Sequence, residues 1–505
     1  MTDLLLQGMF TVLQPACFLT LVAGVLSGIT IGALPGLTAT MGVALLTPLT
    51  FNMAPTTGLV MLCGVYCGAI YGGSISAILI RTPGTPAAAA TVFDGYALTL
   101  KGQAGKALGM SAIASFCGGM FSALALTFIS PQLARIALSF GPPEYFALGL
   151  FGLSIVSSIS GTEVVKGLIG ATFGLLISMV GLDLLTGYPR FGFGIPDLLN
   201  GISFIPVLIG LFAVAEVFIA AEEAIVANKV NVKIAGLLPT LAEIKGCAKT
   251  IFKGSIIGTI VGIIPAAGGD IAAFVAYGEA KRSCKDGDQF GTGVLNGVAA
   301  PESSNNGVTG GALIPLLTLG IPGDAVTAIF LGALMLQGLR PGPLLFTDHA
   351  DVVYAIFSGM IIANIIMLFF GLVGVKFFAR VITIPKPILT PVVFVLCVVG
   401  SYAINNSMFD ILIMMVFGFL GYLMHKFKFP PSPIVLALIL GPMIEGEFRR
   451  SLLMSYGSPT IFFERPICLL LFALTAFSIF GSYMAQRKKE QKPSGVQAPD
   501  MLEAE

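Results

Sequence analysis

The chain has 505 residues, of which 56% are hydrophobic and only 10% are charged. Soluble globular proteins carry about 25% charged residues, so this composition excludes that class and predicts a chain that crosses a lipid bilayer several times. A formal net charge of +1 provides no overall field that would attract nucleic acid, so we expect no nucleic-acid partner.

The first 80 residues carry a single charged side chain, Asp3, and contain the segment GITIGALPGLTAT at residues 28–40. Proline lacks a backbone N–H group and clashes with the preceding turn, so Pro35 predicts a break in an apolar helix. Small and polar residues follow this break, and they are candidates for a binding site at an interrupted helix.

A second apolar segment with a central proline runs from Gly254 to Tyr277. Pro265 predicts a break, and two glycines and Asp270 follow it. Lysines precede and follow the segment, and basic flanks indicate the cytoplasmic side. The segment is therefore either a re-entrant hairpin with arms of about 11 residues, or a kinked spanning helix whose flanks merely look alike.

The two broken segments match each other in sequence. Gly32 and Pro35 correspond to Gly262 and Pro265, each 230 positions later. A second match, 239 positions apart, pairs residues 83–85 (PGT) with residues 322–324 (PGD), and two weaker matches follow in the same order. This order predicts a duplication. We expect a first membrane repeat at 1–220, a polar cytoplasmic connector at 221–253, a second repeat at 254–484 and a cytoplasmic tail at 485–505.

Only the second copy of the broken segment has basic flanks, so the positive-inside rule places the two copies on opposite sides of the membrane. We therefore predict an all-α polytopic membrane protein. It would consist of two inverted repeats with broken helices and re-entrant hairpins, and have roughly 10–12 transmembrane segments.

Polar residues cluster at PESSNNG, residues 301–307, just before an apolar stretch. The cluster fits a binding site with neutral donors and acceptors, or equally the cap and turn at a helix start. Asp270 and Asp324 are acids in apolar surroundings, which predicts a functional role, although burial against a partner such as Arg340 is the structural alternative. Helices that begin after Pro83 and Pro322 would direct backbone N–H groups toward an anion.

These segments resemble the large membrane subunit of the tripartite tricarboxylate transporters, the TctA family. The resemblance covers nearly the whole chain and rests on GITIGALPGLTAT, IRTPGTPAAAATVFDGY, GIIPAAGGDIAAFVAYGEAKR and PESSNNGVTGGALIPLLTLGIPGDAVTAIFLGAL. It implies a multi-pass protein of the bacterial inner membrane that imports citrate or a related carboxylate, driven by an Na⁺ or H⁺ gradient. It also implies a small membrane subunit (TctB-like) and a periplasmic solute-binding protein (TctC-like) as partners.

We expect no enzymatic activity, no catalytic residue and no cofactor besides the coupling ion. A carboxylate channel remains an alternative. An intramembrane aspartyl protease is disfavoured, because both acids lack the first glycine of its G-x-G-D pattern. The predicted substrate-binding residues are Pro35, Gly36, Thr38, Thr40, Thr82, Pro83, Gly84, Thr85, Ser303, Ser304, Asn305, Asn306, Pro322 and Gly323. The predicted residues for the coupling ion are Gly268, Gly269, Asp270, Glu302 and Asp324.

Overall fold

The computed structural model describes residues 2–159, 164–183, 186–222, 238–264, 268–381 and 386–490. Helices dominate these residues, as the composition predicts. The chain forms two compact units: Met1–Phe140 with Ile202–Met424, and Gly141–Gly201 with His425–Glu505. The C-terminal part of the predicted tail, residues 491–505, lies outside the described residues.

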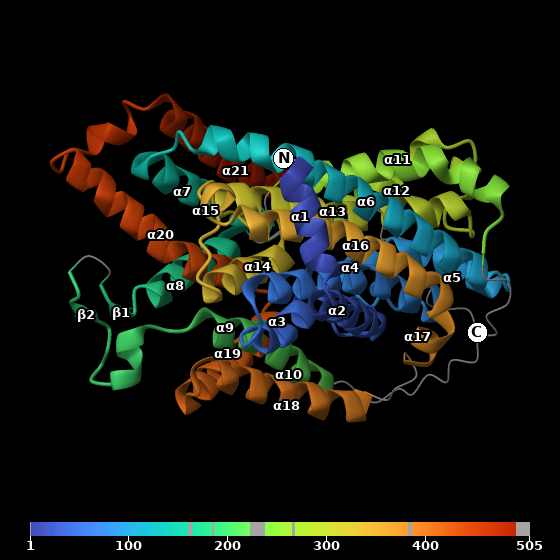
Figure 1. Cartoon of the computed structure of the whole chain (residues 1–505), viewed down its shortest axis with the longest axis horizontal. Coiled ribbons are helices and arrows are strands. Elements are labelled where there is room, and N and C mark those ends of the chain that lie inside the picture. The colour runs from blue at the N-terminus through green and yellow to red at the C-terminus, as the bar shows by residue number, and fades with distance from the viewer. Residues whose placement is uncertain are drawn as a thin grey trace. The chain divides into compact units, whose positions relative to one another are not determined.

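The larger unit holds the helices that concern function (Figure 1). They are α1 (Thr2–Leu13), α2 (Pro15–Ala33), α3 (Ala39–Thr50), α4 (Pro55–Ile80), η1 (Pro86–Ala88), α5 (Thr91–Leu100), α6 (Ala104–Ala137), α9 (Phe204–Leu208), the π-helical turn η3 (Ile209–Val214), α10 (Ala215–Glu222), α11 (Leu241–Ile263), α12 (Gly268–Ser283), η4 (Gly287–Gln289), α13 (Leu295–Leu319), α14 (Ala325–Leu336), α15 (Leu345–Asp348), α16 (Ala350–Val373), α17 (Val375–Val381), α18 (Lys386–Asn405) and α19 (Met408–Lys426).

The smaller unit contains α7 (Pro142–Ile159), α8 (Val164–Ser178), β1 (Gly181–Leu182), β2 (Pro189–Arg190), η2 (Pro196–Asn200), α20 (Ser432–Met454), η5 (Pro459–Phe462) and α21 (Pro466–Glu490). The two strands form an antiparallel hairpin in which Gly181 pairs with Arg190. Arg190 Nη1 lies 2.6 Å from Glu445 Oε1, and this hydrogen bond raises the pKa of Arg190. The ion pair therefore fastens the hairpin to α20.

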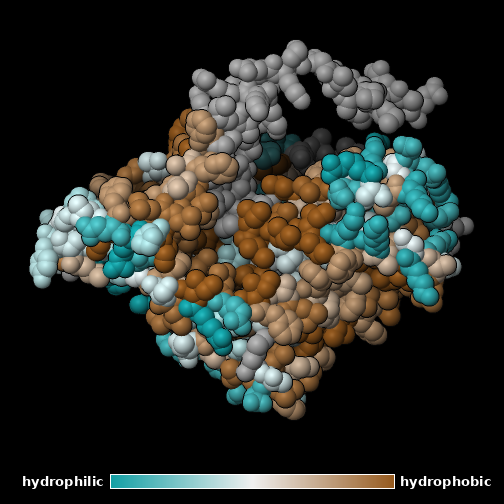
Figure 2. Space-filling view, turned by 90° about the horizontal axis from the view of Figure 1, so that it is seen from above, coloured by the Kyte–Doolittle hydropathy of each residue, from teal (hydrophilic) through white to brown (hydrophobic). Residues whose placement is uncertain are grey.

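Eight of the described helices are long and apolar enough to cross a membrane. They are Pro15–Ala33, Pro55–Ile80, Ala104–Ala137, Phe204–Glu222, Leu241–Ile263, Ala350–Val373, Pro387–Asn405 and Met408–Lys426. Many large hydrophobic side chains are exposed, and Figure 2 shows hydrophobic residues over much of the visible face. Exposed apolar surface on this scale is expected where a protein contacts lipid. The chain is an all-α polytopic membrane protein.

The two most buried helices, α4 and α13, occupy corresponding places in the two predicted repeats. Every residue from Gly58 to Leu79 in α4 is buried, and so is every residue from Gly297 to Thr318 in α13. The first and last residues of the α13 range lie 239 positions after the first and last residues of the α4 range. Because α13 carries Glu302 and several amides and hydroxyls in its interior, a polar segment lies at the centre of the larger unit.

The break predicted at Pro265 is present, since α11 ends at Ile263 and α12 begins at Gly268. Pro265 itself lies outside the described residues. The two helices pack against each other, and Lys253 Nζ lies 3.2 Å from Glu279 Oε1. The chain thus folds back as a hairpin, which a kinked spanning helix would not do. The first arm is longer than predicted, because a capping box at Thr240 starts α11 before the boundary that we placed at Gly254.

Candidate functional site

Two helix pairs, α2 with α4 and α11 with α13, pack through the same glycines in the two halves. An added Cβ at Gly32 would lie 2.8 Å from the carbonyl carbon of Ala69, and one at Gly262 would lie 2.8 Å from the carbonyl oxygen of Val308. Gly28 and Gly258 contact Val65 and Ser304 in the same way. Gly28 and Gly32 of α2 lie 230 positions before Gly258 and Gly262 of α11, and their contacts on α4 and α13 lie 239 positions apart. The sequence match is therefore also a match of three-dimensional contacts.

A loop follows each central helix, and the two loops begin with the same backbone conformation. Arg81 ends α4 in the left-handed region at φ 60°, and Gly320 ends α13 at φ 72°. Left-handed backbone at a helix end favours glycine, so Arg81 is strained there. Gly84 and Gly323, one in each loop, then correspond at 239 positions.

These two loop glycines are packed against neighbouring helices. An added Cβ at Gly84 would lie 2.8 Å from Ser76 Oγ, and one at Gly323 would lie 2.6 Å from the carbonyl oxygen of Gly262. The sequence alone predicts that Gly84→Leu and Gly323→Leu block the substrate path without preventing folding. The structure makes both glycines packing residues, so such variants would disturb folding as well.

Asp324 starts α14, two residues after Pro322. Its carboxylate accepts hydrogen bonds from Thr327 N at 2.8 Å and Thr327 Oγ1 at 2.7 Å, and Tyr66 of α4 also donates to it. The alternative to a functional role was burial of Asp324 against a partner such as Arg340. In the structure, Tyr66 and Thr327 are its hydrogen-bond donors. Because the carboxylate already caps α14, one N–H group that we expected to face an anion is in use.

Asn305 makes the reciprocal contact from the second half to the first. Its Nδ2 donates to the carbonyl oxygen of Ala87 in η1 at 3.1 Å, and an added Cβ at Gly269 would lie 3.2 Å from Ala87 Cβ. Asn305 corresponds to Tyr66 at 239 positions, so each central helix bonds to the loop region of the other half. No α-helix begins directly after Pro83, where a helix start was expected; a short 3₁₀ turn stands there instead.

Glu302 lies in the middle of α13 and is fully buried. Its carboxylate accepts hydrogen bonds from Ser74 Oγ at 2.6 Å, Ser115 Oγ at 2.9 Å, Ser111 Oγ at 3.1 Å and Thr91 Oγ1. These four hydroxyls come from α4, α5 and α6. Of the two alternatives for PESSNNG, the helix cap is wrong, because residues 301–307 lie inside α13 and not at its start.

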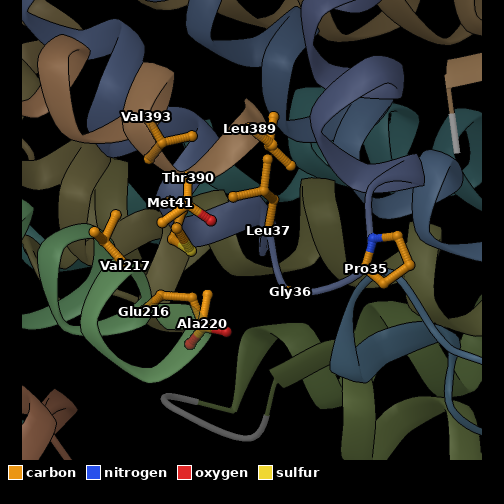
Figure 3. A pocket seen from close by; sticks show the side chains of 10 residues that line it. All are labelled: Pro35, Gly36, Leu37, Met41, Glu216, Val217, Ala220, Leu389, Thr390 and Val393. Carbon is orange, nitrogen blue, oxygen red and sulfur yellow. The ribbon is translucent and has the colours of Figure 1, made fainter. Parts of the chain in front are cut away.

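The first predicted break borders an open recess in the protein surface. Figure 3 shows Pro35, Gly36 and Leu37 on one side, with Glu216 of α10 and Thr390 of α18 among the other lining residues. Gly36 has φ 93°, a conformation that glycine adopts most easily. The recess is mostly apolar with one carboxylate in its wall.

The remaining predicted site residues differ in what their side chains contact. Thr38 Oγ1 accepts from Met41 N and caps α3. The hydroxyls of Ser303 and Ser304 donate to the carbonyl oxygens of Ala299 and Ala272, respectively. Thr82 is exposed and Thr40 is half-buried. Asn306 Oδ1 and Thr85 Oγ1 are buried without a hydrogen-bond partner in the described structure.

Asp270 is exposed in the first turn of α12, directly after Gly268 and Gly269. Glu302 stands apart, within its own group of hydroxyls. Among the described residues, no three His, Cys, Asp or Glu side chains lie close enough together to hold a metal ion.

Several residues that complete these contacts were missed from the sequence. Asp94 accepts from the backbone N–H groups of Gly291, Gly293 and Val294 at 2.8–3.0 Å, and from Tyr277 Oη at 2.8 Å. Asp94 could have been predicted from the sequence, because it is a lone acid in an apolar segment. Ser111 and Ser115, spaced one helical turn apart, were a weaker signal, and Tyr66 and Ser74 had none.

A helical core with interrupted helices and buried acids is typical of secondary transporters. Residues 18–436 match the model of the tripartite tricarboxylate transporter TctA family. The chain belongs to this family, whose members are large subunits of tricarboxylate transporters.

Two relatives come from Agrobacterium vitis. The "uncharacterized 52.8 kDa protein in TAR-I ttuC' 3'region" is 38% identical over 468 residues, which is 92% of this chain and 93% of that protein. The "uncharacterized protein in TAR-II ttuC' 3'region" is 36% identical over 217 residues, which is 43% of this chain and 90% of that protein. No solved structure matches the chain.

Proposed function

We propose that this chain is the permease subunit of a tripartite, ion-gradient-driven importer of tricarboxylates such as citrate, or of related carboxylates. It would act in a bacterial inner membrane with a small membrane subunit and a periplasmic solute-binding protein. Membership of the TctA family supports this class. The observation that carries the proposal is the reciprocal pair of hydrogen bonds, Tyr66 to Asp324 and Asn305 to Ala87, which link the loop region of each half to the other half.

We further propose that the halves are inverted repeats that expose this contact alternately to the two sides. The repeated glycine contacts at constant offsets support the duplication, and the basic flanks of the second hairpin support the inversion. Substrate carboxylates would bind to amides and hydroxyls around Asn305, Asn306 and Thr85. Each such hydrogen bond contributes only about 0.5–1.5 kcal/mol, so the site is suited to substrate delivered by a binding protein.

The test is uptake of radiolabelled citrate by proteoliposomes that contain this chain and its two partner subunits, under an imposed ion gradient. A carrier accumulates citrate above its external concentration, and this accumulation collapses when the gradient is dissipated. Equilibration without accumulation would support the channel alternative, and no citrate movement at all would contradict the proposed substrate.

The matched variants are Asp324→Asn and Asp3→Asn. Asparagine still caps a helix, so Asp324→Asn should keep α14 intact while it removes the carboxylate that accepts from Tyr66. We expect at least a tenfold loss of gradient-driven uptake. Asp3 is exposed in α1, and its variant should transport normally. Normal uptake by Asp324→Asn would make this acid structural.

A further inference from the structure

Four of the described acids in the larger unit are buried, and their hydrogen-bond partners differ in kind. Asp410 accepts from the amide of Asn405. Asp94 accepts from three backbone N–H groups and the Tyr277 hydroxyl, and Asp324 accepts from the N–H and hydroxyl groups of Thr327 and from the Tyr66 hydroxyl. Glu302 binds hydroxyl groups alone: those of Ser74, Thr91, Ser111 and Ser115. All four hydroxyl-bearing residues are fully buried.

This difference decides which protonation states each acid can adopt. A backbone N–H group can only donate, so it stabilises an ionised carboxylate and offers nothing to a carboxylic O–H group. A hydroxyl can donate or accept. The surroundings of Glu302 therefore satisfy both the carboxylate and the carboxylic acid, whereas the backbone N–H groups around Asp94 and Asp324 favour the carboxylate.

The charged and titratable groups on the surrounding helices do not neutralise Glu302. On α4, Tyr71 donates its hydroxyl to the carbonyl oxygen of Gly371, and on α5 Asp94 binds the residues that precede α13. On α6, Lys106 pairs with Glu243. Lys253 of α11 pairs with Glu279 of α12, and Tyr277 of α12 donates to Asp94. Within the described residues, no Lys, Arg or His pairs with Glu302.

The distances also distinguish a proton from a larger ion. Glu302 lies 2.6 Å from Ser74 Oγ, 2.9 Å from Ser115 Oγ and 3.1 Å from Ser111 Oγ, which are direct O–H···O hydrogen bonds. An ion placed between the carboxylate and the hydroxyls would have to replace these bonds and push the oxygens apart. A proton needs no added space.

We propose that Glu302 is the site that binds and releases the transported proton, so that the coupling ion of this permease is H⁺. This inference rests on the proposed function. On binding, the proton adds to one carboxylate oxygen, and the new O–H group donates to one of the four hydroxyls. That hydroxyl then donates to a main-chain carbonyl of its own helix one turn back, as Ser and Thr do in helices. Release reverses these steps.

The location of Glu302 connects the proton to movement of the halves. The acid belongs to α13 of the second predicted repeat, and all four hydroxyls belong to α4, α5 and α6 of the first. A displacement of one repeat against the other separates the acid from its donors. The carboxylate is then left without hydrogen bonds in the interior, which favours proton uptake.

The direct test is infrared difference spectroscopy of the full chain in liposomes during a pH titration, with Glu302→Gln as the assigning variant. The wild type should show the carbonyl band of a buried carboxylic acid that titrates with pH and is absent from Glu302→Gln. Asp324→Asn should retain it. Ser115→Ala removes one donor to the carboxylate, so the midpoint should rise by about 1–2 pH units. Absence of a Glu302-dependent band, or its loss when Na⁺ is added at constant pH, would overturn the proposal.

A transport experiment separates failure of this inference from failure of the proposed function. In the citrate proteoliposomes described above, Glu302→Gln should abolish uptake driven by a pH gradient but keep exchange of internal for external citrate, since exchange needs no net proton movement. Uptake by Glu302→Gln that still follows the pH gradient would refute the proton site. If wild-type protein moves no citrate, the proposed substrate fails, whereas the infrared result still decides whether Glu302 takes up a proton.

Discussion

Alanine at Gly258 tests the repeated packing of the two halves. An added Cβ there would lie 2.7 Å from the carbonyl carbon of Ser304 and inside the contact distance of its oxygen. These are backbone atoms, so α11 and α13 must separate. Overpacking of this kind costs about 1–3 kcal/mol, offset by the gain of about 0.5–1 kcal/mol that alanine brings to a helix interior. Gly28→Ala should behave alike, because its Cβ would lie 2.9 Å from Val65 Cα.

The matched control is Gly246→Ala on the same helix α11, where nothing lies within 4 Å of an added Cβ. Gly246→Ala should gain only the helix propensity of alanine, without overpacking. Gly258→Ala and Gly246→Ala should therefore differ by about 1–3 kcal/mol in the free energy of unfolding. Thermal unfolding in detergent, followed by a thiol-reactive fluorophore that labels buried cysteines, gives the order of the midpoints. A midpoint for Gly258→Ala equal to or above that of Gly246→Ala would refute the close packing of α11 on α13.

Three further predictions concern the Asp94 contacts, the Arg81 cap and the topology. Asp94→Ala leaves the backbone N–H groups of Gly291, Gly293 and Val294 without their acceptor and should lower stability by about 2–4 kcal/mol. Tyr277→Phe, which removes one donor, should cost about 0.5–1.5 kcal/mol, and equal midpoints would contradict this. Arg81→Ala should be less stable than Arg81→Gly by about 1 kcal/mol, and the reverse order would contradict the left-handed cap. Cysteines at the exposed positions Asn52 and Ser283 should react with an impermeant thiol reagent from opposite sides, and equal access from outside would contradict the inverted repeat.

The helix breaks could be predicted because they depend on local stereochemistry. A proline removes a backbone donor wherever it stands, so the end of α11 before Pro265 follows from the sequence. The start of α14 at Ala325, three residues after Pro322, is also local in origin, since Asp324 is a good cap and Thr327 completes the capping box.

The partners of the acids could not be predicted, because they depend on contacts between distant helices. Tyr66 lies 258 positions from Asp324, and Ser74 lies 228 positions from Glu302. The same limit left two alternatives open at PESSNNG. A polar cluster beside a proline is compatible with a helix start, but these residues lie inside a buried helix. There Ser303 and Asn306 donate to carbonyl oxygens of α13, whereas Ser304 and Asn305 donate to other elements.

Counterflow of citrate measures the central claim, alternating access in a carboxylate carrier, most directly. Proteoliposomes with this chain and its partner subunits are loaded with unlabelled citrate and diluted into a trace of labelled citrate, with no ion gradient. An alternating-access carrier should transiently concentrate the label above its final equilibrium level, and Asp3→Asn should do the same. Label that rises to equilibrium without an overshoot, at a rate independent of internal citrate, would contradict a carrier mechanism.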